Sequence, residues 1–157
     1  MNSSTSSSGR DRGFEPKNPD YEARVRQSFD KQAFMHTVGA ELARIEPGEV
    51  HIALPFSESL TQQHGFLHAG AISTVVDTAC GYAALTLMPE DAAVLTVEFK
   101  VNLLSPGRGE RFMAHGVVLK AGRTLMVSNG ELRDAEDNTV ASMTATMMVV
   151  RDRGLVG

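Results

Sequence analysis

Apolar and polar residues alternate strictly along much of the second half of the chain. In 94-VLTVEFKVNLL-104, every second position from Leu95 to Leu103 is apolar, and a period of two is typical of a β-strand with one buried face. Three further runs alternate in the same way, over 111–120, 124–133 and 139–150. The turns between these runs contain Gly, Pro, Asp and Asn, so we expect four strands that form an antiparallel meander.

A pair of shorter strands and one helix are predicted before this region. Apolar residues alternate from Val50 to Leu54 after a Pro-Gly turn at 47–48, which indicates a short strand on each side of that turn. Further upstream, apolar residues recur at helical spacing, and Gly39 is a typical helix stop. We therefore expect an N-terminal helix over about 20–34.

The most apolar segment runs from Ala71 to about Met88 and has a helical period. Its apolar positions recur at i, i+3, i+4 and i+7, and the opposite side carries no charge except Asp77. A helix without a charged face is a buried helix, so we expect one over about 70–88. Wrapping the predicted sheet around it is the economical way to bury it. The sequence thus predicts an α+β fold, a curved antiparallel sheet around a long central helix.

Length and charge narrow the class of protein. The chain has 157 residues, of which we expect 19–151 to form one domain between tails at 1–18 and 152–157. The tail 1–18 is rich in Ser, is expected to be disordered, and lacks the apolar region of a secretory signal. The net charge of −4, with no Lys or Arg run, argues against nucleic-acid binding. No segment is apolar enough for membrane insertion, and the single cysteine fits a reducing cytoplasm.

The start of the central helix and its one acid are the candidate chemistry. Free backbone amides at a helix start near Ala69 and Gly70 could polarise a carbonyl, and small residues let it approach closely. Asp77 follows two turns later, roughly 10–12 Å along the helix, so one chain cannot easily bring both together. A symmetric dimer could. Asp77 could act as a base or nucleophile there, or be a structural acid that hydrogen-bonds to Ser73 or Thr78.

The stretch HGFLHAGAISTVVDTACGYAA resembles the signature of PaaI-like hotdog-fold acyl-CoA thioesterases, Asn-x5-His-Gly-Gly-x6-Asp. The resemblance covers roughly residues 40–150. It implies a hotdog fold, with Asp77 as general base or nucleophile, His68 beside the substrate carbonyl and the Ala69 amide polarising it. Gln62 stands in place of the family's Asn, and Ala69 in place of its first Gly. Thr96 falls where relatives have a residue that assists the water.

The resemblance implies hydrolysis of an acyl-CoA, for which we expect a medium- or long-chain aliphatic acyl group. The low aromatic content of 6% favours an aliphatic over an aromatic group. No cofactor is required, because CoA arrives with the substrate. We expect a homodimer or a dimer of dimers. A non-catalytic acyl-CoA or lipid-binding module is the alternative, favoured by Gln62. A hotdog acyl-CoA dehydratase is disfavoured, because the helix lacks the Asp-x4-His type pairing of such enzymes.

Five other residues are secondary candidates. His64 and His68 are four residues apart but lack a third metal ligand, so no metal is predicted; His64 is kept as a substrate-binding candidate together with Gly70, beside the simpler interpretation of a loop hydrogen bond. Lys120 and Arg123 flank a hairpin turn, where they could clamp CoA phosphates or be solvated. Cys80 lies on the apolar stripe of the helix, which favours core packing over a nucleophile.

Overall fold

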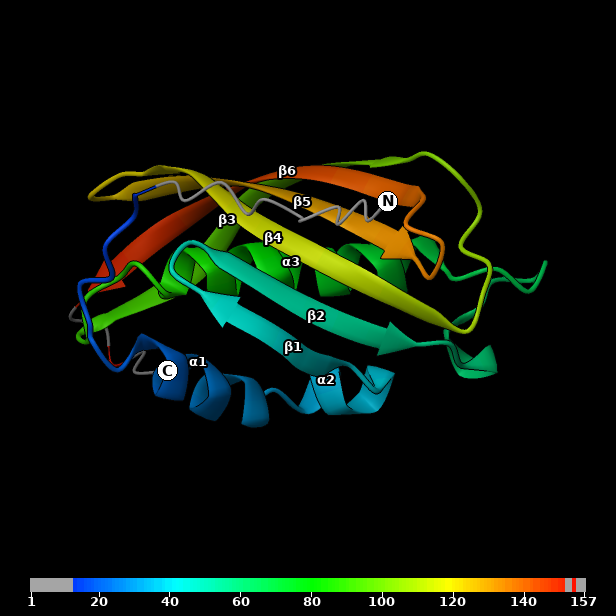
Figure 1. The fold of residues 1–157 in the computed structure, drawn as a ribbon, viewed down its shortest axis with the longest axis horizontal. Coiled ribbons are helices and arrows are strands. Elements are labelled where there is room, and N and C mark those ends of the chain that lie inside the picture. Colours follow the sequence, from blue (N-terminus) through cyan, green and yellow to red (C-terminus); the bar gives the residue numbers. More distant parts are fainter. Residues whose placement is uncertain (1–12, 152–153, 155–157) are drawn as a thin grey trace, which may run out of the picture.

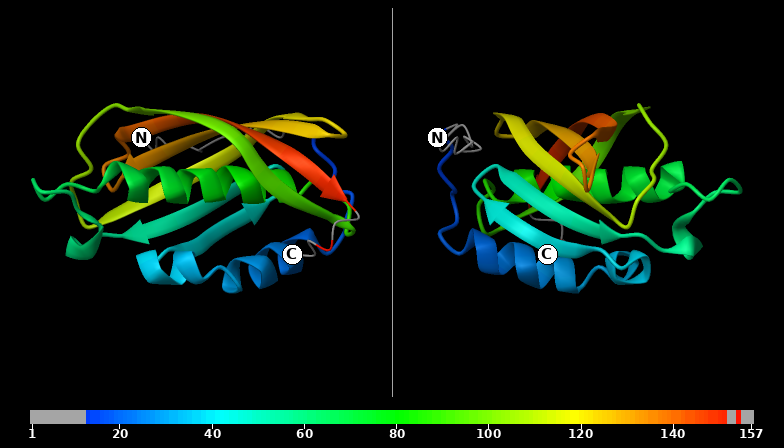
Figure 2. Two further views of the ribbon diagram at one scale, coloured as in Figure 1. Left: turned by 180° about the vertical axis from the view of Figure 1, so that it is seen from behind. Right: turned by 45° about the vertical axis from the view of Figure 1, so that its right-hand side comes forward.

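The protein is a six-stranded antiparallel sheet curved around one long helix (Figures 1 and 2). The structure is a computed structural model that describes residues 13–151 and Gly154. Its elements are α1 (Tyr21–Asp30), α2 (Ala33–Val38), β1 (Glu41–Glu46), β2 (Glu49–Pro55), η1 (Glu58–Leu60), α3 (Ala69–Leu85), β3 (Ala92–Leu103), β4 (Arg111–Ala121), β5 (Leu125–Asp134) and β6 (Thr139–Arg151). The predicted α+β fold with an enclosed central helix is confirmed.

The order of the strands differs from the predicted meander. The sheet order is β1-β2-β4-β5-β6-β3, so of the four strands expected in the meander, β3 to β6, only β4, β5 and β6 follow one another as neighbours. β2 occupies the outer edge of β4, and β3 pairs instead with β6, from Ala92 against Arg151 to Leu103 against Ala141. This arrangement has a physical reason. With β2 and β3 on opposite edges of the β4–β6 meander, the helix between them in sequence lies across the concave face (Figure 2).

Two paired glycines bring α3 close to the sheet. Gly116 on β4 lies directly opposite Gly130 on β5. A Cβ atom added at Gly116 would overlap the backbone of Ala79, and one added at Gly130 would overlap Val76 and the sulfur of Cys80. The glycines therefore leave a flat strip on which the middle of α3 rests, and the buried core lies between this strip and the helix.

The N-terminal helical region is two helices rather than the one expected over 20–34. Gln32 has an extended backbone, with ψ of 93°, and separates α1 from α2. α2 ends at Gly39 in the left-handed conformation, as predicted. Phe29 is buried against Tyr82 of α3, and the Arg24 guanidinium donates to the carbonyl oxygen of Pro89, 2.8 Å away. These contacts hold α1 beside the C-terminal half of α3.

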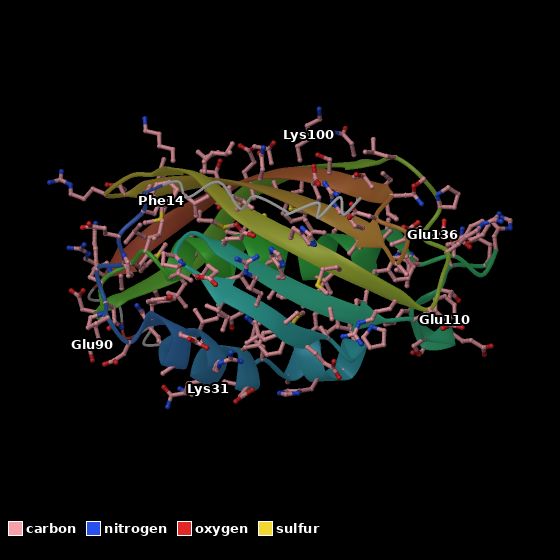
Figure 3. All side chains as sticks on the ribbon, in the orientation of Figure 1. Phe14, Lys31, Glu90, Lys100, Glu110 and Glu136 are labelled. Carbon is pink, nitrogen blue, oxygen red and sulfur yellow. The ribbon has the colours of Figure 1, made fainter. Side chains whose placement is uncertain are left out.

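The ends of two predicted segments also differ. α3 ends at Leu85, three residues before the expected boundary, and a turn leads from it to Pro89. Phe14 (labelled in Figure 3) packs against the core, and Asn18 is buried, so the packed part of the chain begins before residue 19. The rest of the expected tails, at 1–12, 152–153 and 155–157, lies outside the described residues. Among the described helices, none is long and apolar enough to cross a membrane.

Candidate active site

Asp77 lies in the middle of α3, where it meets β3. The Thr96 hydroxyl, from β3, donates to Oδ1 of Asp77 at 2.9 Å and also lies 3.3 Å from the sulfur of Met147. The structural alternative from the sequence named other partners, Ser73 and Thr78. Thr78 donates to the backbone oxygen of its own helix instead. The structure therefore joins Asp77 and Thr96, two of the residues that the signature and the downstream strand singled out.

The surroundings of Asp77 favour a carboxyl group that can accept a proton. Partial burial raises its pKa above the ordinary value of 3.8, and the hydrogen bond from Thr96 opposes this rise. Burial disfavours the charged form because the protein solvates a carboxylate less well than water does. A raised pKa brings the group closer to neutral pH, where a general base is most effective.

Asp77 opens into a cleft between three elements. The cleft has a volume of about 250 Å³ and runs between α1, the C-terminal half of α3, and the first residues of β3. Tyr82 and Gly81 of α3 line it, and Ser28 of α1 and Gln32, which follows α1, form part of its wall. The sequence analysis missed the contribution of α1. The contact between Ser28 and Tyr82 spans 54 positions in the chain, and no local pattern reports such a contact.

His68 is the N-cap of α3. Its backbone is extended, and its Nδ1 atom accepts a hydrogen bond from the Gly70 amide at 2.8 Å. The Gly70 amide is thus occupied, whereas the Ala69 amide makes no hydrogen bond to any residue between 13 and 151. Ala69 has helical backbone geometry, so alanine fits where the family has glycine. Ala69 N–H is accordingly the amide that remains for a polarised carbonyl.

Gln62 begins a tight turn beside this helix start. Its backbone bonds to Phe66, its side-chain oxygen accepts from the His64 amide, and Gly65 has the positive φ that the turn needs. The side-chain carbonyl of Gln62 therefore faces its own loop. His64 is exposed. Arg108 was not among the site residues predicted from the sequence. Its guanidinium stacks 4.4 Å above the ring of Phe66.

The predicted site residues form two separate groups within one chain. The acid half-site consists of Asp77 and Thr96, beside the N-terminal half of β3. The amide half-site consists of Gln62, His68 and Ala69, and the pocket at Gln62 is lined by the C-terminal end of β3. Eight residues of helix, about 12 Å of rise, separate Ala69 from Asp77. The structure confirms that one chain does not bring the two groups together.

The remaining candidates lie elsewhere. Lys120 and Arg123 are exposed at the β4–β5 hairpin. Strand β4 of this hairpin hydrogen-bonds to Gly48, which lies near the C-terminal end of α3. Cys80 is fully buried, and desolvation raises the pKa of its thiol to about 12, so it is a core residue, as expected. Across residues 13–151, no group of three His, Cys, Asp or Glu side chains could hold a metal ion.

Known proteins share this sequence and this architecture. A family model described as the thioesterase superfamily matches residues 64–141. The medium/long-chain acyl-CoA thioesterase YigI of Escherichia coli (strain K12) is 30% identical over 131 residues, which cover 74% of this chain and 84% of YigI. The crystal structure of a thioesterase family protein from Silicibacter pomeroyi is 50% identical, with a TM-score of 0.82 over 84% of this chain and 99% of that one.

A more distant structure shares the fold alone. The Escherichia coli PaaI protein from the phenylacetic acid degradation operon has a TM-score of 0.78 at 17% identity, over 83% of this chain and 94% of PaaI. The resemblance inferred from the stretch around His68 and Asp77 is confirmed by these findings. The chain therefore belongs to the thioesterase superfamily and has its hotdog fold.

Proposed function

We propose that the protein hydrolyses acyl-CoA thioesters to a free acid and CoA. The observation that carries this proposal is the partly buried Asp77, which has a raised pKa and a Thr96 hydrogen bond and faces an open cleft. Asp77 takes a proton from a water molecule that attacks the carbonyl, or Asp77 attacks the carbonyl itself and forms an acyl anhydride that water then hydrolyses to the free acid. In either route the Ala69 amide of the other subunit stabilises the oxyanion. The carbon–sulfur bond then breaks, and the CoA thiolate leaves and is protonated. The residues supply a base and an oxyanion donor, so no cofactor is needed.

The proposed active site is shared between two subunits. β3 forms an edge of the sheet, and its apolar side chains Leu95, Val97, Phe99 and Leu103 are each 44–51% exposed. An unpaired apolar edge strand favours pairing with another strand. Two β3 strands paired antiparallel about an axis between Phe99 and Lys100 would place Thr96 of one subunit beside Leu103 of the other. Each acid half-site would then face an amide half-site.

This proposal extends to a homodimer, or a dimer of dimers, and it has a direct test. Light scattering should give at least twice the mass of one chain. A substitution that breaks the proposed strand pairing, Val97→Pro, should yield inactive monomers, because a proline on β3 removes a backbone donor. Pro on this edge leaves the core untouched, since Val97 is exposed. An active monomer would contradict the shared site.

We propose an aliphatic acyl group of medium or long chain length. The name of the relative YigI, a medium/long-chain acyl-CoA thioesterase, supports this class, as does the low aromatic content of the chain. His64, exposed in the turn before α3, and Gly70, exposed in the first turn of α3, are proposed to contact the thioester end of the substrate. Lys120 and Arg123, two exposed cations on one hairpin, are proposed to bind the CoA phosphates.

Cysteine usage supports the cytoplasm as the proposed location. Cys80 is a free thiol, fully buried against the sheet. Proteins of oxidising compartments commonly use their cysteines in disulfides. A lone reduced thiol in the core fits a reducing compartment.

One observation favours a second function, a non-catalytic acyl-CoA-binding module. The side-chain oxygen of Gln62 bonds to the His64 amide in its own loop. An amide held in this way would not orient a water molecule as the family's Asn would. Substrate could then bind beside Asp77 without being hydrolysed.

Thiol release separates the two functions. Purified protein is incubated with CoA thioesters of acetate, octanoate, decanoate and palmitate, and free CoA is measured with a thiol reagent. The hydrolase proposal expects release that is lost in Asp77→Asn. Tight binding of decanoyl-CoA in calorimetry, with no thiol release by the unmodified protein, would instead establish the binding module.

A further inference from the structure

A glycine inside the most buried helix has no packing reason to be there. Gly81 is buried within α3, one turn beyond Asp77, and glycine weakens a helix relative to alanine. At Gly116 and Gly130 the lack of a side chain lets α3 approach the sheet. At Gly81, by contrast, an added Cβ would meet no atom within 4 Å. Gly81 lines the Asp77 cleft, so the missing side chain leaves space in that cleft.

The space has the length of an acyl chain. Asp77, Gly81 and Leu85 lie at i, i+4 and i+8 on one face of α3, and all three line the cleft. Eight residues of helix rise about 12 Å. An extended chain advances about 3.3–3.6 Å for every three bonds, so about ten bonds fit along this face. Val94 of β3 provides an apolar wall on the other side.

A polar group of side chains borders the cleft beyond Gly81. The Tyr82 hydroxyl accepts from the Gln32 amide at 2.8 Å and donates to the Ser28 hydroxyl at 3.2 Å. These bonds leave the Ser28 proton and the Gln32 side-chain oxygen without a partner among residues 13–151. An apolar chain end placed here would remove water from both groups and return no hydrogen bond. A site built in this way discriminates against a ligand that lacks the bonding group.

We propose that this cleft binds an aliphatic acyl group of about ten bonds that ends in a hydrogen-bonding group such as a hydroxyl. Gly81 provides the room, and Ser28 and Gln32, each hydrogen-bonded to Tyr82, recognise the end of the chain. The inference rests on the proposed function, because it takes the ligand to be a CoA thioester. It narrows the proposed acyl group to a medium chain with a polar end.

The experiment measures binding, so that it does not depend on turnover. Calorimetry determines the Kd of acetyl-CoA, decanoyl-CoA and 10-hydroxydecanoyl-CoA for the Asp77→Asn protein. We expect the hydroxylated chain to bind about fivefold more tightly than decanoyl-CoA, the effect of one additional hydrogen bond. Adding Ser28→Ala together with Gln32→Leu, which removes both groups that lack a partner, should reduce this preference to less than about twofold.

A larger side chain at position 81 tests whether the acyl chain occupies the space beside Gly81. Gly81→Leu in the same background should weaken both ten-carbon ligands more than about tenfold, since each methylene kept out of an apolar site changes affinity about fourfold. Acetyl-CoA should change less than about twofold. The matched control is Gly81→Ala, which adds one carbon and should bind all three ligands nearly as before. Circular dichroism checks that each variant is folded. If Gly81→Leu does not fold, two results carry the test: tighter binding of decanoyl-CoA than of acetyl-CoA, and loss of the hydroxyl preference in the protein with Ser28→Ala and Gln32→Leu.

The outcomes separate this inference from the proposed function. Equal affinity for the plain and hydroxylated chains overturns the polar end of the site, and unchanged decanoyl-CoA binding by folded Gly81→Leu overturns the acyl site itself. Thiol release by the unmodified protein with either of these results means that only the inference fails. The expected binding pattern without thiol release supports the inference, and only the proposed hydrolysis fails.

Discussion

Replacing Asp77 by Asn tests the proposed base while leaving its surroundings in place. The amide has nearly the same shape, and its oxygen can still accept the Thr96 hydrogen bond. Loss of a general base lowers the rate about 10²–10⁴-fold, which corresponds to about 2.7–5.4 kcal/mol of transition-state stabilisation at about 1.36 kcal/mol for each tenfold. We expect that fall in kcat for decanoyl-CoA, with little change in KM, because the group acts mainly in the transition state.

The pH profile gives the same assignment an independent readout. Burial raises the pKa of Asp77 above 3.8, so kcat/KM should fall as the pH drops through that raised value and the base becomes protonated. The Thr96 hydrogen bond lowers the pKa. Thr96→Val should therefore move the acid limb of the profile to higher pH, and Asp77→Asn should abolish it. Stopped or continuous thiol release between about pH 4 and 8 measures the limb, around the ordinary carboxyl range.

The same pKa has a consequence for stability. Because the folded-state pKa lies above the unfolded value of 3.8, ionised Asp77 lowers the free energy of unfolding at neutral pH. This destabilisation is complete above the folded pKa and disappears as the pH falls below 3.8. Folded Asp77→Asn should thus have a higher Tm than the unmodified protein at pH 7 and no such advantage near pH 3. A near-normal rate in folded Asp77→Asn refutes the catalytic assignment, and a rate loss that accompanies a lower Tm points to a structural acid.

Three further predictions concern other residues. Gln62→Ala should lower kcat about tenfold if the amide orients the water, and no effect in steady-state kinetics would make Thr96 the residue that holds it. Gly116→Ala should lower the free energy of unfolding in urea by about 1–3 kcal/mol or more, because the methyl group would overlap the backbone of Ala79; a variant of unchanged stability would show that α3 can move away freely. Cys80 should react with a thiol reagent only after denaturation, since it is buried and its pKa is raised to about 12; rapid reaction in the native protein would contradict its place in the core.

The sequence predicted the fold as far as local periodicity reaches. The apolar segment on both sides of Asp77 predicted the enclosed helix. The alternation of apolar and polar residues predicted the strands close to their observed limits. Alternation does not state which strand lies beside which, so the position of β3 next to β6 was not predictable from it. The break at Gln32 was missed because apolar positions continue at helical spacing into α2, although Phe34 is 58% exposed.

The candidate site, like the fold, could be predicted from the sequence only in part. Asp77 stood out as the only charge in an apolar helix, and the helix start followed from the rule that first-turn amides are free. Thr96 came from the family resemblance, since nothing on β3 itself distinguishes this threonine. The wall of the cleft opposite α3 depends on Ser28 of α1 and on Gln32 between α1 and α2, which meet Tyr82 only in the folded chain. Such side chains look like ordinary polar surface positions in the sequence.

The strand order also sets when the acid half-site can form during synthesis. β3 precedes β4, β5 and β6 in the chain, yet its backbone pairs only with β6 among the described strands. Thr96 lies opposite Met147, so its place beside Asp77 is fixed only after the last strand has been made. Such long-range pairing is slow, and a nascent chain that awaits it exposes the apolar residues of β3. A truncation within β6 should therefore remove the catalytic geometry and release an aggregation-prone strand at the same time.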